Sequence, residues 1–128
     1  MRVLFDTHAL LWFLADDRRL PRKIRLRLLD PGTELCFSSV SILEIAIKHS
    51  LKPDAMPCEP DEVRKTAEAA GLAELPFSAK HSVAVGSLPW IHRDPFDRML
   101  LAQARVERMT LLTHDDAIAA YGDGVLSF

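Results

Sequence analysis

The chain has 128 residues, of which 48% are hydrophobic and 27% charged, a usage that is ordinary for globular proteins and excludes disorder. Sixteen basic and eighteen acidic residues give a formal net charge of −2, which excludes nucleic-acid binding by bulk positive charge alone. A chain of this length holds one hydrophobic core, so we expect one domain, residues 1–128.

The cysteines and the N-terminal sequence indicate the cellular compartment in which the protein is expected. Cys36 and Cys58 belong to no C-x-x-C pair, so neither a disulfide framework nor a zinc site is expected, and a reducing compartment fits. The apolar N-terminal stretch is interrupted by Asp6 and His8, which a secretory leader tolerates badly. We expect a cytoplasmic protein that has no association with a membrane.

Short apolar strands alternate with segments of helical spacing in the first half of the chain. Pro21 favours a helix start, and Ser41 with Glu44 matches a capping box. The expected elements are a strand at 3–5, a helix at 7–15, a helix from 21, a strand at 35–37 and a helix at 41–50.

The second half continues the alternation. The expected elements are helices at 61–70 and 79–87, a helix from Asp94 to Arg108, strands at 75–77, 111–112 and 125–126, and a helical turn at 115–121. Strands that alternate with helices in this order predict an α/β fold: a three-layer α/β/α sandwich with a mainly parallel central sheet.

Carboxylates fall where expected strands meet helices. Asp6 ends the first strand, Glu44 follows the second, Asp94 and Asp97 open the late helix, and Asp115 with Asp116 follows the strand at 111–112. In a parallel sheet these junctions share one edge, where ligands bind. Four separate segments can therefore deliver carboxylates to one place.

Several carboxylates in one cleft repel one another and need a cation unless they are protonated. Oxygen donors without thiolates suit Mg²⁺ or Mn²⁺, ions that polarise phosphoryl oxygens and activate water. Phosphodiester hydrolysis is the reaction that this set suits. The alternative is that each acid only caps its helix, which is the simpler explanation for any single residue but not for four junctions together.

Four segments resemble the motifs of PIN-domain ribonucleases, in family order and over nearly the whole chain. They are residues 3–12 (VLFDTHALLW), 38–45 (SSVSILEI), 92–104 (HRDPFDRMLLAQA) and 111–115 (LLTHD). The nearest branch is that of the VapC-type toxins of bacterial toxin–antitoxin modules.

The resemblance implies a PIN-like fold and a metal-dependent endoribonuclease that is the toxin of such a pair. It implies that four acids bind Mg²⁺ or Mn²⁺ and act in RNA cleavage, with Thr7 and Thr113 in support: Asp6, Glu44, Asp97 and Asp115. Asp94 can join this cluster, and His114 stands where many relatives have a basic residue, so motif register favours Asp115 over Asp116. The resemblance also implies a cognate antitoxin protein and a homodimer.

Two other functions fit parts of the pattern. A haloacid-dehalogenase-like phosphatase also uses an aspartate after its first strand, but it needs a second aspartate where His8 stands. A catalytically silent PIN-like interaction module would use its acids only as caps. No P-loop, dinucleotide fingerprint or serine elbow is present, so no nucleotide cofactor is expected.

Other polar and aromatic groups have ordinary expected roles. The six basic residues within positions 18–27 predict a solvated helix face, with an RNA-binding patch as the alternative. Arg93 and Arg98 are expected to pair with neighbouring acids, with contact to a substrate phosphate as the alternative. The histidines near the cleft, His8 and His92, are expected to be structural. Trp12 and Trp90 are expected to be core or dimer-interface residues rather than base-stacking platforms.

Overall fold

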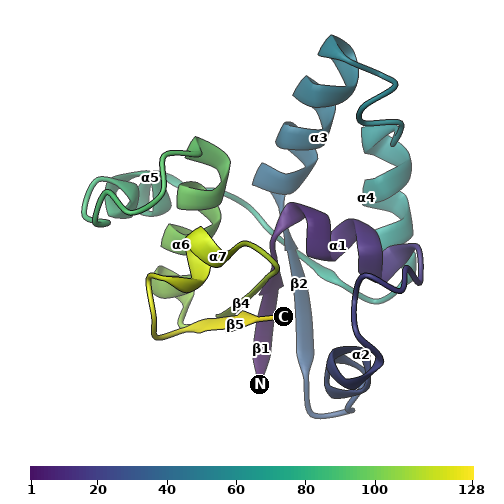
Figure 1. Ribbon diagram of the computed structural model, residues 1–128, viewed down its shortest axis with the longest axis horizontal. Helices are drawn as coiled ribbons and strands as arrows, with labels where there is room; N and C mark the ends of the chain where they lie inside the picture. The colour runs from purple at the N-terminus through teal and green to yellow at the C-terminus, as the bar shows by residue number, and fades with distance from the viewer.

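The computed structural model describes residues 1–128 and confirms the expected order of strands and helices (Figure 1). The elements are β1 (Arg2–Phe5), α1 (Thr7–Leu14), α2 (Arg22–Leu28), β2 (Glu34–Ser38), α3 (Ser39–Leu51), α4 (Pro60–Ala69), β3 (Ala73–Leu75), α5 (Ala79–Val85), α6 (Pro95–Glu107), β4 (Thr110–Thr113), α7 (Asp116–Ala119) and β5 (Val125–Ser127).

The five strands form one sheet in the order β3-β2-β1-β4-β5, and every neighbouring pair is parallel. The chain moves outward from β1 through β2 to β3, then crosses back to β4 on the other side of β1. The strand order therefore reverses between β1 and β4. In open α/β sheets a ligand site lies beyond the carboxyl ends of the strands at such a reversal.

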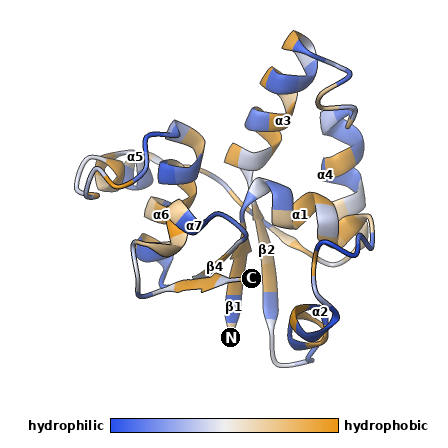
Figure 2. Ribbon diagram, viewed as in Figure 1, coloured by the Kyte–Doolittle hydropathy of each residue, from blue (hydrophilic) through white to orange (hydrophobic).

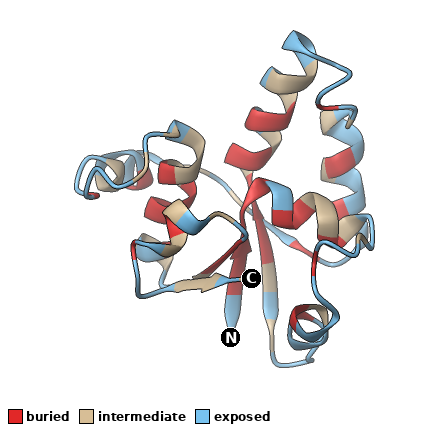
Figure 3. Cartoon of the chain, in the orientation of Figure 1, coloured by how far each residue is buried: buried red, intermediate tan, exposed pale blue.

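Alternation along the central strands divides the core into two layers. Val3 and Phe5 of β1 face a cluster with residues of α1, α2 and α4, whereas Leu4 between them faces a cluster with residues of α5, α6 and α7. Figure 3 shows the central strands buried, with helices on both sides that carry buried and exposed residues in turn. The predicted three-layer α/β/α sandwich is thus confirmed.

The start of α3 and the position of β3 differ from the sequence prediction. Helix α3 begins at Ser39 rather than Ser41, because the hydroxyl of Ser38 accepts a hydrogen bond from the amide of Val40 (3.0 Å) and caps the helix. Strand β3 ends at Leu75 instead of beginning there. The next residue is Pro76, which has no amide hydrogen to donate to a neighbouring strand.

Figure 2 shows hydrophobic residues concentrated in the strands and interrupted by polar ones along each helix. This is the pattern of helices that cover a sheet with one face. None of the helices combines the length and the hydrophobicity needed to span a membrane.

Candidate metal centre

A cleft of about 410 Å³ opens beyond the carboxyl ends of β1 and β4. All five predicted carboxylates line it, although they come from four separate segments. Its lining residues are Asp6, Thr7, His8, Trp12, Glu44, Lys48, Asp94, Asp97, His114 and Asp115. Asp116, the alternative to Asp115, is exposed and does not line the cleft.

Asp6 lies where β1 turns into α1, and its two carboxylate oxygens have different partners. Oδ1 accepts a hydrogen bond from the amide of Ala9 (2.8 Å) and caps α1. Oδ2 accepts a hydrogen bond from the hydroxyl of Thr113 at the end of β4. The side chain is buried, and this burial raises the pKa of the Asp6 carboxyl.

Glu44 is buried in the second turn of α3, so the predicted capping box with Ser41 is wrong. Because α3 begins two residues early, Glu44 is too far along the helix to reach its first amides. Instead Oε1 accepts a hydrogen bond from Thr7 Oγ1 (2.6 Å), and Oε2 pairs with the ammonium of Lys48 one turn later. The hydrogen bond to Glu44 raises the pKa of Lys48.

Asp94 and Asp97 lie at the start of α6. Oδ1 of Asp94 accepts hydrogen bonds from the amides of Phe96 (2.9 Å) and Asp97 (3.2 Å), so Asp94 is the N-cap of this helix. Burial, and next the negative charge of Asp94, raise the pKa of Asp97 to about 7. The cleft thus contains more negative charge than its own cations neutralise.

His92 joins two of these carboxylates. Its Nε2 atom lies 2.9 Å from Asp97 Oδ2 and 3.1 Å from Asp115 Oδ2, while Asp115 Oδ1 accepts a hydrogen bond from the amide of Ala117 (2.8 Å) and caps α7. His92 therefore bridges two carboxylates of the cleft, and the expectation that its role is structural stays a prediction. His92 stands only two residues before Asp94, which is the one sequence feature that could have indicated its place.

Arg98 holds the loop that carries His92, and it does so without a carboxylate partner. Its guanidinium is buried and donates hydrogen bonds to the carbonyl oxygens of Pro89 (2.9 Å) and Val85 (3.1 Å) and to the hydroxyl of Tyr121 (3.2 Å). The indole of Trp90 covers it, with the guanidinium carbon 4.0 Å from the ring centroid. The expected salt bridge of Arg98 is thus replaced by carbonyl contacts.

The donor set fits a divalent cation. His92, Asp97 and Asp115 each offer a ligand atom, and these atoms lie within 4.8 Å of one another. Carboxylate oxygens dominate the cleft, the donor type that suits Mg²⁺ and Mn²⁺. Several carboxylates share one cavity. Burial, and next the negative charge of neighbouring carboxylates, raises the pKa of Asp97, and a bound cation would offset that negative charge.

A parallel α/β sheet with acids gathered at the carboxyl edge of its strands defines a class of protein with a candidate divalent-metal centre. The chain belongs to the PIN domain family, whose model matches residues 3–124. A comparison with curated protein sequences found no match.

Several solved structures have the same fold. The first, VapBC2 from Rickettsia felis bound to a DNA fragment from its promoter, gives a TM-score of 0.70 at 16% identity and covers 100% of this chain and 99% of its own. A toxin–antitoxin complex from Klebsiella pneumoniae gives 0.65 at 20% identity, with 98% and 96% covered. DNA-bound VapBC from Salmonella typhimurium gives 0.67 at 18% identity, with 100% and 97% covered.

Proposed function

We propose that this PIN-domain protein is a metal-dependent endoribonuclease that hydrolyses phosphodiester bonds of RNA. The observation that carries the proposal is the gathering of five carboxylates in one cleft, where the pKa of Asp97 is raised to about 7. Perturbed carboxylates in a cleft are typical of catalytic centres. The proposal also rests on membership of the PIN domain family.

Four carboxylates would hold Mg²⁺ or Mn²⁺, with Asp94 as a fifth candidate: Asp6, Glu44, Asp97 and Asp115. When bound, such an ion supplies Lewis-acid polarisation of a phosphoryl oxygen and lowers the pKa of water. Thr113 and Thr7 fix the orientation of Asp6 and Glu44 through their hydroxyl groups. Lys48 places an ammonium group in the cleft, where it can contact a substrate phosphate.

The similar structures support a proposal about partners, because several of them are VapBC or toxin–antitoxin complexes. We propose that this chain is likewise the toxin of a pair, that an antitoxin protein binds it in the cytoplasm, and that it forms a homodimer. The support from this chain is a stripe of exposed apolar residues on α3 at four-residue spacing: Leu43, Ile47 and Leu51. Such a stripe on one helix face is typical of a protein–protein contact.

Cleavage of total cellular RNA by the purified protein tests the function. We expect discrete fragments in Mn²⁺ or Mg²⁺, none in EDTA, and none from Asp6→Asn, which removes one ligand charge. Asp116→Asn is the matched control, because Asp116 is an exposed aspartate that does not line the cleft. It should cleave like the wild type.

The alternative, a catalytically silent interaction module, predicts neither RNA cleavage nor binding of a divalent ion. Acids that only cap helices bind no divalent ion, so Mn²⁺ would leave the melting temperature unchanged and RNA intact. A folded, antitoxin-free preparation that neither cleaves RNA nor is stabilised by Mn²⁺ would therefore refute the nuclease proposal.

A further inference from the structure

Aromatic rings gather along one wall of the cleft, and they include Trp12, which was expected in the core or at an interface. The ring centroid of Trp12 lies 5.9 Å from that of His8, 5.5 Å from that of His114 and 6.0 Å from that of Phe128. His114 and Phe128 stack at 5.0 Å with an angle of 27° between their planes. Residues from α1, the end of β4 and the C-terminus thus form one aromatic cluster.

Three members of this cluster line the cleft together with the carboxylates: His8, Trp12 and His114. His8 and His114 are exposed, and Trp12 is half-buried. Trp12 is the one hydrophobic side chain among the ten that line the cleft. Packing of the C-terminus explains the contact between Trp12 and Phe128, but it does not explain why three ring systems face a cavity that is otherwise polar.

A nucleic-acid strand has chemical groups that fit both the carboxylates and the aromatic wall of the cleft. Its phosphate suits a cation site, and its base suits aromatic faces, since base–aromatic stacking is the main way in which proteins hold single-stranded RNA. The imidazoles add ring nitrogens that can form hydrogen bonds with a base edge. At about 410 Å³, the cleft places the carboxylates and the aromatic wall within one small cavity.

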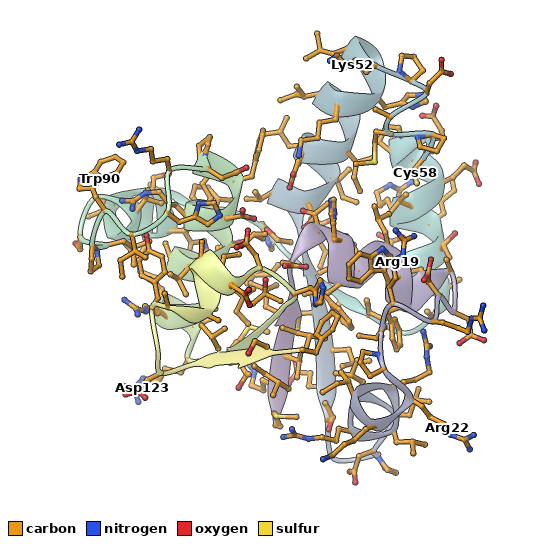
Figure 4. All side chains as sticks on the ribbon, viewed as in Figure 1. Arg19, Arg22, Lys52, Cys58, Trp90 and Asp123 are labelled. Carbon is orange, nitrogen blue, oxygen red and sulfur yellow. The ribbon has the colours of Figure 1, made fainter.

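Positive charge lies directly beside the aromatic wall. The guanidinium carbon of Arg19 is 4.9 Å from the Trp12 ring centroid, and Asp17 fixes the group through two contacts, Nε–Oδ1 (3.1 Å) and Nη2–Oδ2 (2.7 Å). A second depression is lined by three arginines, Arg18, Arg22 and Arg25, and by two aspartates, Asp16 and Asp17. Figure 4 shows Arg19 beside α1 and Arg22 at the start of α2. These cations are placed to meet backbone phosphates next to the wall.

We propose that the wall formed by His8, Trp12 and His114 stacks the base of the single-stranded RNA nucleotide next to the scissile phosphate, with Arg19 on the adjoining phosphate. This inference rests on the proposed ribonuclease function and assigns a base-binding wall beside the candidate cation site. A base in a duplex is covered by its neighbours and cannot stack on a side chain.

The chain contains two tryptophans, so fluorescence can report on each separately. In Trp90→Phe the emission comes from Trp12, and in Trp12→Phe it comes from Trp90, which lies on the loop before α6 (Figure 4). The probe is a phosphorothioate single-stranded RNA hexamer in Mg²⁺. An abasic hexamer with the same backbone charge is its control. We expect saturable quenching of Trp12 by the RNA hexamer alone and no change at Trp90.

Binding by the variants completes the test. Trp12→Leu should weaken binding of the RNA hexamer by roughly 5- to 150-fold, the effect of losing one base–aromatic stack, and leave abasic binding unchanged. Trp12→Phe should keep most of the affinity, and Trp90→Leu all of it. Equal affinity of the wild type for both hexamers, or wild-type RNA binding by a folded Trp12→Leu, would overturn the proposal.

The two proposals fail separately. Base-dependent quenching of Trp12 without cleavage of any RNA would keep the stacking wall and refute the nuclease. Metal-dependent cleavage with no preference for the RNA hexamer over the abasic one would keep the nuclease and refute the stacking wall.

Discussion

At the scale of single residues, the acids of the cleft use their two oxygens for different purposes. Asp6 and Asp115 each give Oδ1 to a helix amide and turn Oδ2 toward a second partner, Thr113 and His92 respectively. One oxygen of each carboxylate therefore stays off the helix amides, so a capping role does not exclude the proposed cation binding. The amide that is capped fixes the side-chain rotamer, and this fixes where the other oxygen points.

Substitutions of Asp6 separate these two roles. Asp6→Asn keeps an oxygen that accepts the hydrogen bond from the amide of Ala9. It also removes a carboxylate whose burial is unfavourable, as the raised pKa of Asp6 indicates. We therefore expect no loss of stability. Asp6→Ala also loses the cap, which should cost about 1 kcal/mol. Urea denaturation of the two variants in EDTA measures the difference. A larger loss in Asp6→Asn than in Asp6→Ala would contradict this account of the cap.

Arg98 is the residue whose loss should most disturb the site from a distance. Arg98→Met leaves several buried carbonyl oxygens without their donor, so we expect about 2–4 kcal/mol of destabilisation. Arg93→Met, at an exposed arginine in the same loop region, should change the free energy of unfolding by less than about 0.5 kcal/mol. Equal losses in both variants, measured by urea denaturation, would show that the buried contacts of Arg98 are not what holds the loop.

At the scale of elements, the sequence predicted where strands and helices lie better than which turn of a helix a side chain occupies. The short apolar strands at Val3–Phe5 and around Leu111 stood out because both faces of each are buried. The start of α3 was missed because Ser38, Ser39 and Ser41 are all acceptable caps, and the choice depends on where β2 leaves the sheet. That choice decides whether Glu44 caps the helix or faces the cleft.

The sequence predicted less well which side chains of the site contact one another. Lys48 is four residues after Glu44, a spacing that does indicate contact on a helix. The contact of His92 with Asp97 and Asp115 depends on a loop whose path is set by carbonyl groups that bind Arg98. No periodicity or motif encodes such a path, because it arises from tertiary packing.

At the scale of the whole molecule, the net charge is small, but acidic and basic residues are concentrated in different regions. The cleft gathers five carboxylates, whereas basic residues are dense along α2 and the segment before it. A net charge of −2 therefore neither favours nor opposes RNA binding by itself. In the proposed function, the attraction for RNA would act at the edge of the cleft and weaken with salt.

This imbalance makes stability depend on pH. Between pH 3.8 and about 7, the folded metal-free protein keeps a proton on Asp97 that the unfolded chain has lost. The contribution of Asp97 to the free energy of unfolding therefore falls as pH rises through this range. Asp97→Asn should remove that contribution, and Asp123→Asn, at an exposed turn, should not. Urea denaturation in EDTA from pH 4 to 8 measures both, and identical pH profiles for wild type and Asp97→Asn would contradict the prediction.

The central claim is that these carboxylates form a cation site, and Mn²⁺ binding measured by calorimetry in two buffers of different ionisation enthalpy tests it most directly. We predict binding by the wild type with proton release that declines from pH 6 to pH 8, as Asp97 loses its proton beforehand. Asp97→Asn should bind more weakly by at least about tenfold, and Asp116→Asn like the wild type. Absence of Mn²⁺ binding by the folded wild type at pH 8, or equal affinity in Asp97→Asn, would contradict the account.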